Sequence, residues 1–67
     1  MKFEYDAEVD AGYVYFEYPL KDGQVRKTTQ VNETISLDLD KNGKLLGIEI
    51  LNASKLLRKE SLVTVSD

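Results

Sequence analysis

The sequence contains no cysteine, no histidine and no tryptophan, and it has a single proline. Without cysteine there is no disulfide framework, no thiolate nucleophile and no structural zinc site. Without histidine, the Ser-His and Cys-His pairs of nucleophilic catalysis are absent, as is the iron site built from two histidines and a carboxylate. Any bound metal would be a hard cation held by oxygen ligands. We therefore predict no cofactor and favour a non-enzymatic protein over an enzyme.

Long apolar runs are also missing. No segment approaches the ~18 apolar residues of a membrane span, and residues 1–10 carry four acids without the apolar stretch of a secretory signal. We expect a cytoplasmic protein with no membrane contact. Basic residues are outnumbered, nine against twelve acids, which gives a net charge of −3. Because nucleic-acid binding rests on a basic surface, we expect no nucleic-acid partner.

The chain is 67 residues long and 42% apolar, which predicts a single ordered domain over residues 1–67. A domain near this size buries only about 60% of its unfolded surface and is marginally stable alone. Small chains without disulfides often gain stability by association. We therefore expect a homodimer, a complex with a protein partner, or both.

The hydrophobic pattern predicts an α+β fold: a small, mostly antiparallel sheet of about five strands in a meander, with one short C-terminal helix packed on it. Residues 7–11 form the first turn; a helix over residues 7–14 is a weaker alternative, because Gly12 interrupts it. The most polar of the strands, residues 25–31, suits a sheet edge. The five predicted strands are Lys2–Asp6, Gly12–Tyr18, Val25–Val31, Thr34–Asp40 and Lys44–Leu51.

A hairpin joins the last two of these strands. Asn42-Gly43 favours a two-residue type I′ turn, which places Lys41 opposite Lys44. The turn and the alternation of apolar residues give the same register. The predicted apolar pairs are Leu39 with Leu46, Leu37 with Ile48 and Ile35 with Ile50; on the polar face, Ser36 opposes Glu49 and Asp38 opposes Gly47.

The C-terminal quarter predicts a helix of about two turns. Asn52 is a plausible N-cap, and Ala53, Leu56 and Leu57 form a narrow apolar stripe that would pack on the sheet. The basic group Lys55, Arg58 and Lys59 suits the C-terminal end of such a helix. Residues 62–65 predict either a last short strand or an ordered tail, and we favour the strand.

One motif suggests metal chemistry. Residues 38–43 followed by Glu49 satisfy the calcium-loop pattern D-x-[DN]-x-[DN]-G-x5-E. That loop needs a helix on each side, whereas both flanks here have the period of strands. We favour a hairpin with a solvated acidic face.

Two carboxylate groups remain as alternatives to that interpretation. Asp38, Asp40 and Glu49 share the polar face of the hairpin, where they could bind a divalent cation weakly. Asp6, Glu8 and Asp10 form a second acidic group in the first turn, where backbone capping and solvation are the favoured roles. The alternative function is therefore a carboxylate-based metal-binding protein or metal-assisted enzyme. No catalytic residue is assigned.

Several segments resemble the YuzE-like proteins of bacteria and archaea, a family without a known function. The opening residues 5–11, Tyr-Asp-Ala-Glu-Val-Asp-Ala, followed by Tyr13-Val14, are similar to the family's first motif. Residues 37–40, 42–44 and 47–54 (Gly-Ile-Glu-Ile-Leu-Asn-Ala-Ser) are similar to its second half. The resemblance implies a small α+β domain and an antitoxin-like role beside a toxin-like protein, and it assigns no catalytic residues. The leading hypothesis is a non-enzymatic protein-binding module.

Overall fold

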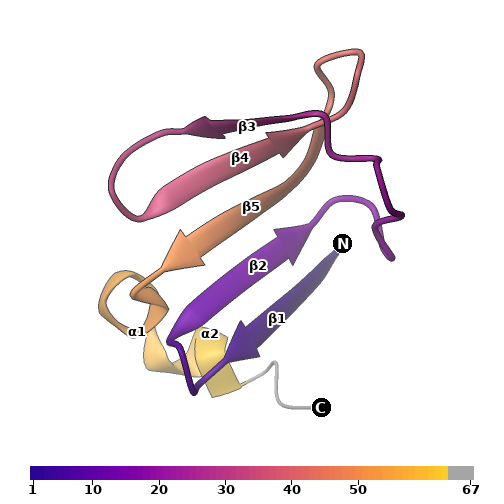
Figure 1. The fold of residues 1–67 in the computed structure, drawn as a ribbon. Helices are drawn as coiled ribbons and strands as arrows, with labels where there is room; N and C mark the ends of the chain where they lie inside the picture. Colours follow the sequence, from indigo (N-terminus) through magenta and orange to yellow (C-terminus); the bar gives the residue numbers. More distant parts are fainter. Residues whose placement is uncertain (64–67) are drawn as a thin grey trace.

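The structure, a computed structural model, describes residues 1–63 and shows one open antiparallel sheet followed by two short helices (Figure 1). The α+β class predicted from the sequence is confirmed. The strands are β1 (Lys2–Asp6), β2 (Ala11–Tyr15), β3 (Lys27–Gln30), β4 (Ile35–Leu39) and β5 (Leu45–Leu51), and the helices are α1 (Ala53–Leu56) and α2 (Lys59–Val63).

The strand order is β1-β2-β5-β4-β3, which differs from a consecutive meander. Strand β2 pairs with β5 rather than with β3, so residues 16–26 carry the chain to the far edge of the sheet. Strand β5, the longest of the five, therefore lies at the centre of the sheet. The polar strand β3 lies at an edge, as predicted, with all four residues exposed.

The predicted register of the β4–β5 hairpin is confirmed over most of its length. Leu37 pairs with Ile48, and Ile35 pairs with Ile50. The predicted pair of Leu39 with Leu46 is wrong: Leu39 pairs with Leu45, and the register shifts after Asp38. An extra residue in one strand is the signature of a β-bulge.

The turn of this hairpin also differs from the predicted type I′. Only Gly43 has a positive φ, of 78°, whereas type I′ requires positive φ at both central residues. The Gly43 N–H donates to the Asp40 carbonyl (3.0 Å), and the Asp40 N–H donates to the Lys44 carbonyl (2.9 Å). The loop is therefore Lys41–Gly43, with glycine at its left-handed position, which matches a common three-residue hairpin.

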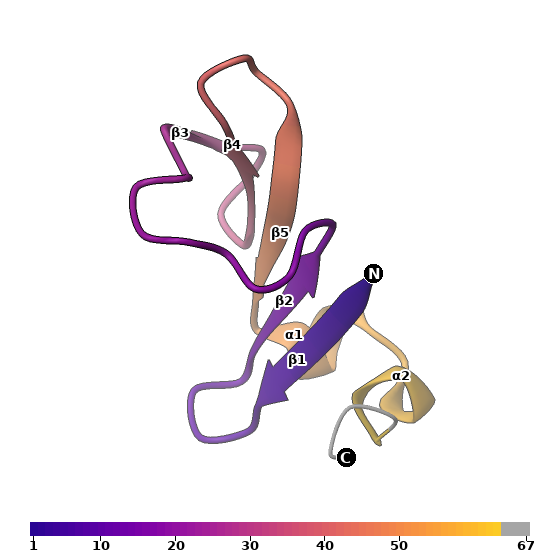
Figure 2. The same cartoon turned by 90° about the vertical axis from the view of Figure 1, so that its right-hand side faces the viewer.

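The sheet has two chemically different faces. The strand pairing places Tyr13, Asp38 and Glu49 on one face of the sheet, here called the front face. The opposite, back face carries the apolar set, and α1 and α2 lie on that side in Figure 2. The back-face residues of the strands are Phe3, Tyr5, Gly12, Val14, Lys27, Thr29, Ile35, Leu37, Leu39, Leu46, Ile48 and Ile50.

The core is small and lies near the β2–β5 pair. Among the described residues, the buried apolar side chains are Leu46, Ile50 and Ala53, at 2%, 8% and 0% exposure. Gly12 lets this region close, because a Cβ there would stand 2.7 Å from the Phe3 ring and 3.7 Å from the Ala53 Cβ. Helix α1 thus packs against β2 at a position without a side chain.

The C-terminal segment departs from the predicted single helix. Helix α1 is one turn long, because Leu57 is extended (φ −108°, ψ 154°), and a second helix, α2, follows. The predicted strand over residues 62–65 is wrong at Leu62, which lies in α2; residues 64 and 65 lie outside the described part. Lys, Glu and Leu favour helix, and Glu60 lies in the first turn, where negative charge is stabilising.

Candidate functional site

At the centre of the front face, the ring of a tyrosine packs over a glycine. Tyr13 lies on β2, and its ring covers Gly47 of the neighbouring strand β5. The Tyr13 hydroxyl donates to Asp38 Oδ2 (2.6 Å) on β4, one strand further along. Asp38 Oδ1 accepts a second hydrogen bond from Thr28 Oγ1 (2.7 Å) on the edge strand β3. Side chains of β2, β4 and β3 are therefore linked across the sheet.

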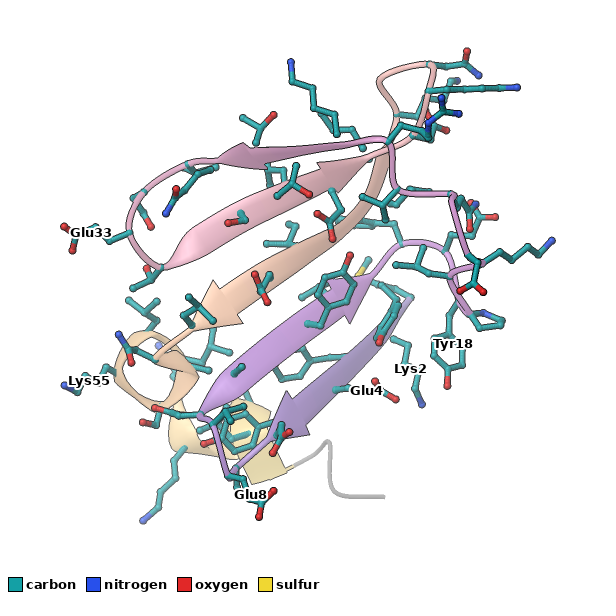
Figure 3. All side chains as sticks on the ribbon, in the orientation of Figure 1. Lys2, Glu4, Glu8, Tyr18, Glu33 and Lys55 are labelled. Atoms are coloured by element: carbon teal, nitrogen blue, oxygen red, sulfur yellow. The ribbon has the colours of Figure 1, made fainter. Side chains whose placement is uncertain are left out.

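A second tyrosine–carboxylate pair lies beside the first. The Tyr15 hydroxyl donates to Glu4 Oε1 (2.9 Å) on β1. The Tyr13 and Tyr15 rings meet edge to face at 4.6 Å, and Tyr15 meets Tyr18 in the same way at 4.9 Å. The Lys2 ammonium lies 4.8 Å from the Tyr18 ring, a cation–π contact that Figure 3 shows beside Glu4.

These contacts determine the chemistry that the tyrosines offer. Partial burial, then the hydrogen bond to Asp38, raises the pKa of Tyr13 well above 10. Partial burial, then the hydrogen bond to Glu4, raises the pKa of Tyr15. Both hydroxyls are therefore protonated near neutral pH and act as hydrogen-bond donors, which is a binding or structural role rather than that of a general base.

A third carboxylate, Asp10, joins the first turn to α1. Asp10 has a positive φ of 53° and accepts the Ala53 N–H at its backbone carbonyl (2.9 Å). Its Oδ1 accepts the Ser54 N–H (2.9 Å) and the Tyr5 hydroxyl (2.7 Å). Its Oδ2 accepts the Ser54 hydroxyl (2.7 Å). The hydrogen bond from Tyr5, then that from Ser54, lowers the pKa of the Asp10 carboxyl.

This arrangement corrects the predicted helix cap. Asn52 precedes α1 with a φ of 54° and makes no side-chain cap hydrogen bond. Asp10, far away in the sequence, supplies the acceptors that a local N-cap would give. No local pattern identifies Asp10 as that cap, since the contact depends on how the β1–β2 turn meets the end of β5.

The predicted group Asp6, Glu8 and Asp10 separates into different roles. Asp6 Oδ1 accepts the Glu8 N–H (3.0 Å), an Asx-type contact within the turn. Glu8 is exposed at the tip of that turn (Figure 3). Asp10 points to α1. The capping role favoured for these residues therefore describes Asp6 and Asp10.

The predicted group Asp38, Asp40 and Glu49 is only partly brought together. Asp38 and Glu49 lie on the front face of adjacent strands, with Glu49 opposite Ser36 as predicted. Asp40 Oδ1 instead accepts the N–H groups of Asn42 (2.8 Å) and Lys44 (2.9 Å). The Lys44 N–H, then that of Asn42, lowers the pKa of the Asp40 carboxyl.

The calcium-loop interpretation of this segment does not hold, because strands β4 and β5 flank it where a calcium loop needs helices. Within residues 1–63, no group of three or more carboxylates is placed to hold a metal ion. Asp38 and Asp40 use their oxygens in contacts that maintain the sheet and the turn.

We predict that Ca²⁺ or Mg²⁺ leaves the melting temperature unchanged to within about 1 °C, since a cation bound only by the folded state would raise it. Thermal melts across a cation titration measure this. A saturable rise that is lost in Asp38→Asn but kept in Glu33→Gln would contradict the prediction. Glu33 is the matched acidic control, because it projects from the turn at the far side of the sheet (Figure 3).

The back face is the second candidate surface. Helices α1 and α2 lie behind β1, β2 and the end of β5 and do not extend over β4 (Figures 1 and 2). Among the described elements, extensive contacts join only neighbouring strands. Four apolar side chains beyond the helices stay partly exposed; we call them the open apolar area, namely Ile35, Leu37, Leu39 and Ile48.

No described helix is long and apolar enough to cross a membrane. A hollow of about 580 Å³ that is open to solvent lies at the β1–β2 turn beside Glu4, Tyr13 and Glu49. The molecule is thus a small α+β domain with an acidic, tyrosine-rich front face and a half-covered apolar back face.

Comparison with known proteins shows the family to which this chain belongs. Residues 2–54 match the model described as "Protein of unknown function (DUF2283)", so the chain belongs to that family. It is 46% identical over 56 residues to "Uncharacterized protein MJ0789" of Methanocaldococcus jannaschii. That match covers 84% of this chain but 44% of the relative, so the chain spans less than half of the relative's length. No solved structure matches the chain.

Proposed function

We propose that this domain is a non-enzymatic protein-binding module and that the open apolar area on its back face is the binding surface. The observation that carries the proposal is the uncovered β4 strand. A sheet with one apolar face normally buries that face against a second layer. Here α1 and α2 form this layer over part of the sheet and leave Ile35, Leu37, Leu39 and Ile48 partly exposed.

The front face supports the non-enzymatic part of the proposal. Its central tyrosines are protonated donors paired with carboxylates, and the hollow beside Tyr13 is open to solvent. These features stabilise the sheet and present a polar surface, whereas catalysis needs a group poised to exchange protons or attack substrate. The antitoxin-like role implied by the YuzE-like resemblance is one specific form of the proposal. A cytoplasmic location belongs to the same proposal.

Site-specific photo-crosslinking in cells tests the binding surface. A photoreactive amino acid at Thr29 sits on the back face beside Leu37, and the same probe at Gln30 sits on the front face of the same exposed strand. We expect protein adducts from position 29 and few from position 30, since only the back face lies against a partner. Equal labelling from both positions, or no adduct from either, would overturn the proposal.

A further inference from the structure

We propose that a second copy of this chain covers the open apolar area, so that two back faces pack against each other around a two-fold axis. This inference rests on the proposed function and names the partner for the same surface. A two-fold contact is self-complementary, so the surface must be able to face itself without repulsion.

The charge distribution allows this pairing on the back face only. None of the back-face strand residues is acidic, and their one charged residue, Lys27, lies on the edge strand. The front face carries four carboxylates, Glu4, Asp6, Asp38 and Glu49, against one lysine, Lys2. Two front faces would repel one another, whereas two back faces join apolar surfaces and leave the carboxylates in water.

The geometry of the layers fits a second sheet. Sheets pack face to face at a spacing of about 10 Å, close to the distance between a sheet and a helix layer. A second sheet over β4 would therefore lie in the same layer as α1 and α2 and complete the cover that they begin. Leu37 and Ile48 pair at the centre of the open apolar area, where the two copies would meet.

The open apolar area is the part of the back face that one copy leaves incompletely buried. Its four side chains stay partly exposed, whereas Leu46 and Ile50 on the same face are buried, at 2% and 8% exposure. An apolar side chain such as Leu37 then reaches full burial only in the dimer.

Two lysine substitutions on adjacent residues of β4 test the proposal. Leu37 is on the back face and Ser36 is on the front face opposite Glu49. Analytical ultracentrifugation should give the wild type and Ser36→Lys a mass about twice 7.6 kDa, and Leu37→Lys a mass near 7.6 kDa. Leu37→Lys places two charges in the contact, so the dimer dissociation constant should rise about a hundredfold or more.

A milder variant and a wild-type measurement guard against misfolding of Leu37→Lys. Leu37→Ala keeps the face apolar and should weaken the dimer with less effect on each subunit. The wild-type melting temperature should rise with protein concentration, as for any dimer that unfolds to monomers. A concentration-independent melting temperature would overturn the inference, as would equal masses for Leu37→Lys and Ser36→Lys.

The crosslinking experiment separates failure of this inference from failure of the proposed function. An adduct from position 29 with twice the chain mass supports both. A monomeric wild type with a position-29 adduct to a different protein would overturn the dimer and leave the binding module intact. A monomeric wild type with no adduct from position 29 would overturn both.

Discussion

Gly47→Ala is expected to destabilise the domain by about 1–3 kcal/mol, the range for overpacking a filled site. In an ordinary strand the same change would be mildly stabilising, because glycine loses more backbone entropy on folding. The decisive contact is steric: a Cβ on Gly47 would lie 2.5 Å from Tyr13 Cε2 and closer still to the Tyr13 hydroxyl. The ring cannot retreat freely, since its hydroxyl is held by Asp38 at 2.6 Å and its edge meets Tyr15.

A double-mutant cycle with Tyr13→Ala checks this explanation by chemical denaturation of the four proteins. Removing the ring opens the space above residue 47, so Gly47→Ala in the Tyr13→Ala background should be neutral or slightly stabilising. The expected coupling energy is therefore large and of opposite sign to the single effect. If Gly47→Ala costs the same in both backgrounds, the Tyr13 ring is not what requires glycine there.

The β4–β5 hairpin shows what a local pattern can predict and what it cannot. The period-two alternation of apolar residues predicts the pairs of Leu37 with Ile48 and Ile35 with Ile50, because a slip by one residue would turn every apolar side chain to water. The same alternation says little about the loop itself. Asn42-Gly43 favours a two-residue turn, but Asp40 offers its side-chain oxygen to two backbone N–H groups and stabilises a three-residue loop instead.

The strand order and the helix cap lie beyond local patterns for a related reason. Alternation shows which residues of a strand share a face, but it does not show which strand pairs with which, so the placement of β5 between β2 and β4 is not predictable from it. The packing of Tyr13 over Gly47 depends on that placement. Asn52 has the composition of an N-cap, yet its backbone is left-handed and its side chain makes no cap. Asp10 caps α1 through contacts 44 residues apart in sequence, which only the folded sheet brings together.

Asp10→Gly and Asp10→Asn are expected to lower the melting temperature, with Gly the more harmful at roughly 5 °C or more. Glycine tolerates the positive φ of 53° at this position, so its effect isolates the lost carboxylate rather than backbone strain. The carboxylate joins Tyr5 of β1 to Ser54 of α1. Asparagine keeps one oxygen acceptor and should retain part of the link. Thermal melts at neutral pH measure the difference, and Asp22→Gly in the exposed segment between β2 and β3 is a matched control.

The pH dependence of the melting temperature distinguishes the contribution of the Asp10 charge from that of its packing. Because the Tyr5 and Ser54 hydrogen bonds lower the pKa of Asp10 in the folded state, the carboxylate contributes stability fully above its unfolded pKa, near 3.8. That contribution is lost as the pH falls through the lower folded pKa. Between about pH 6 and about pH 3, the wild-type melting temperature should therefore fall more steeply than that of Asp10→Asn. Asp40, whose pKa is also lowered, is present in both proteins and contributes equally to their slopes. Parallel curves for the two proteins would show that Asp10 acts through packing alone, and the capping role assigned to its charge would then be wrong.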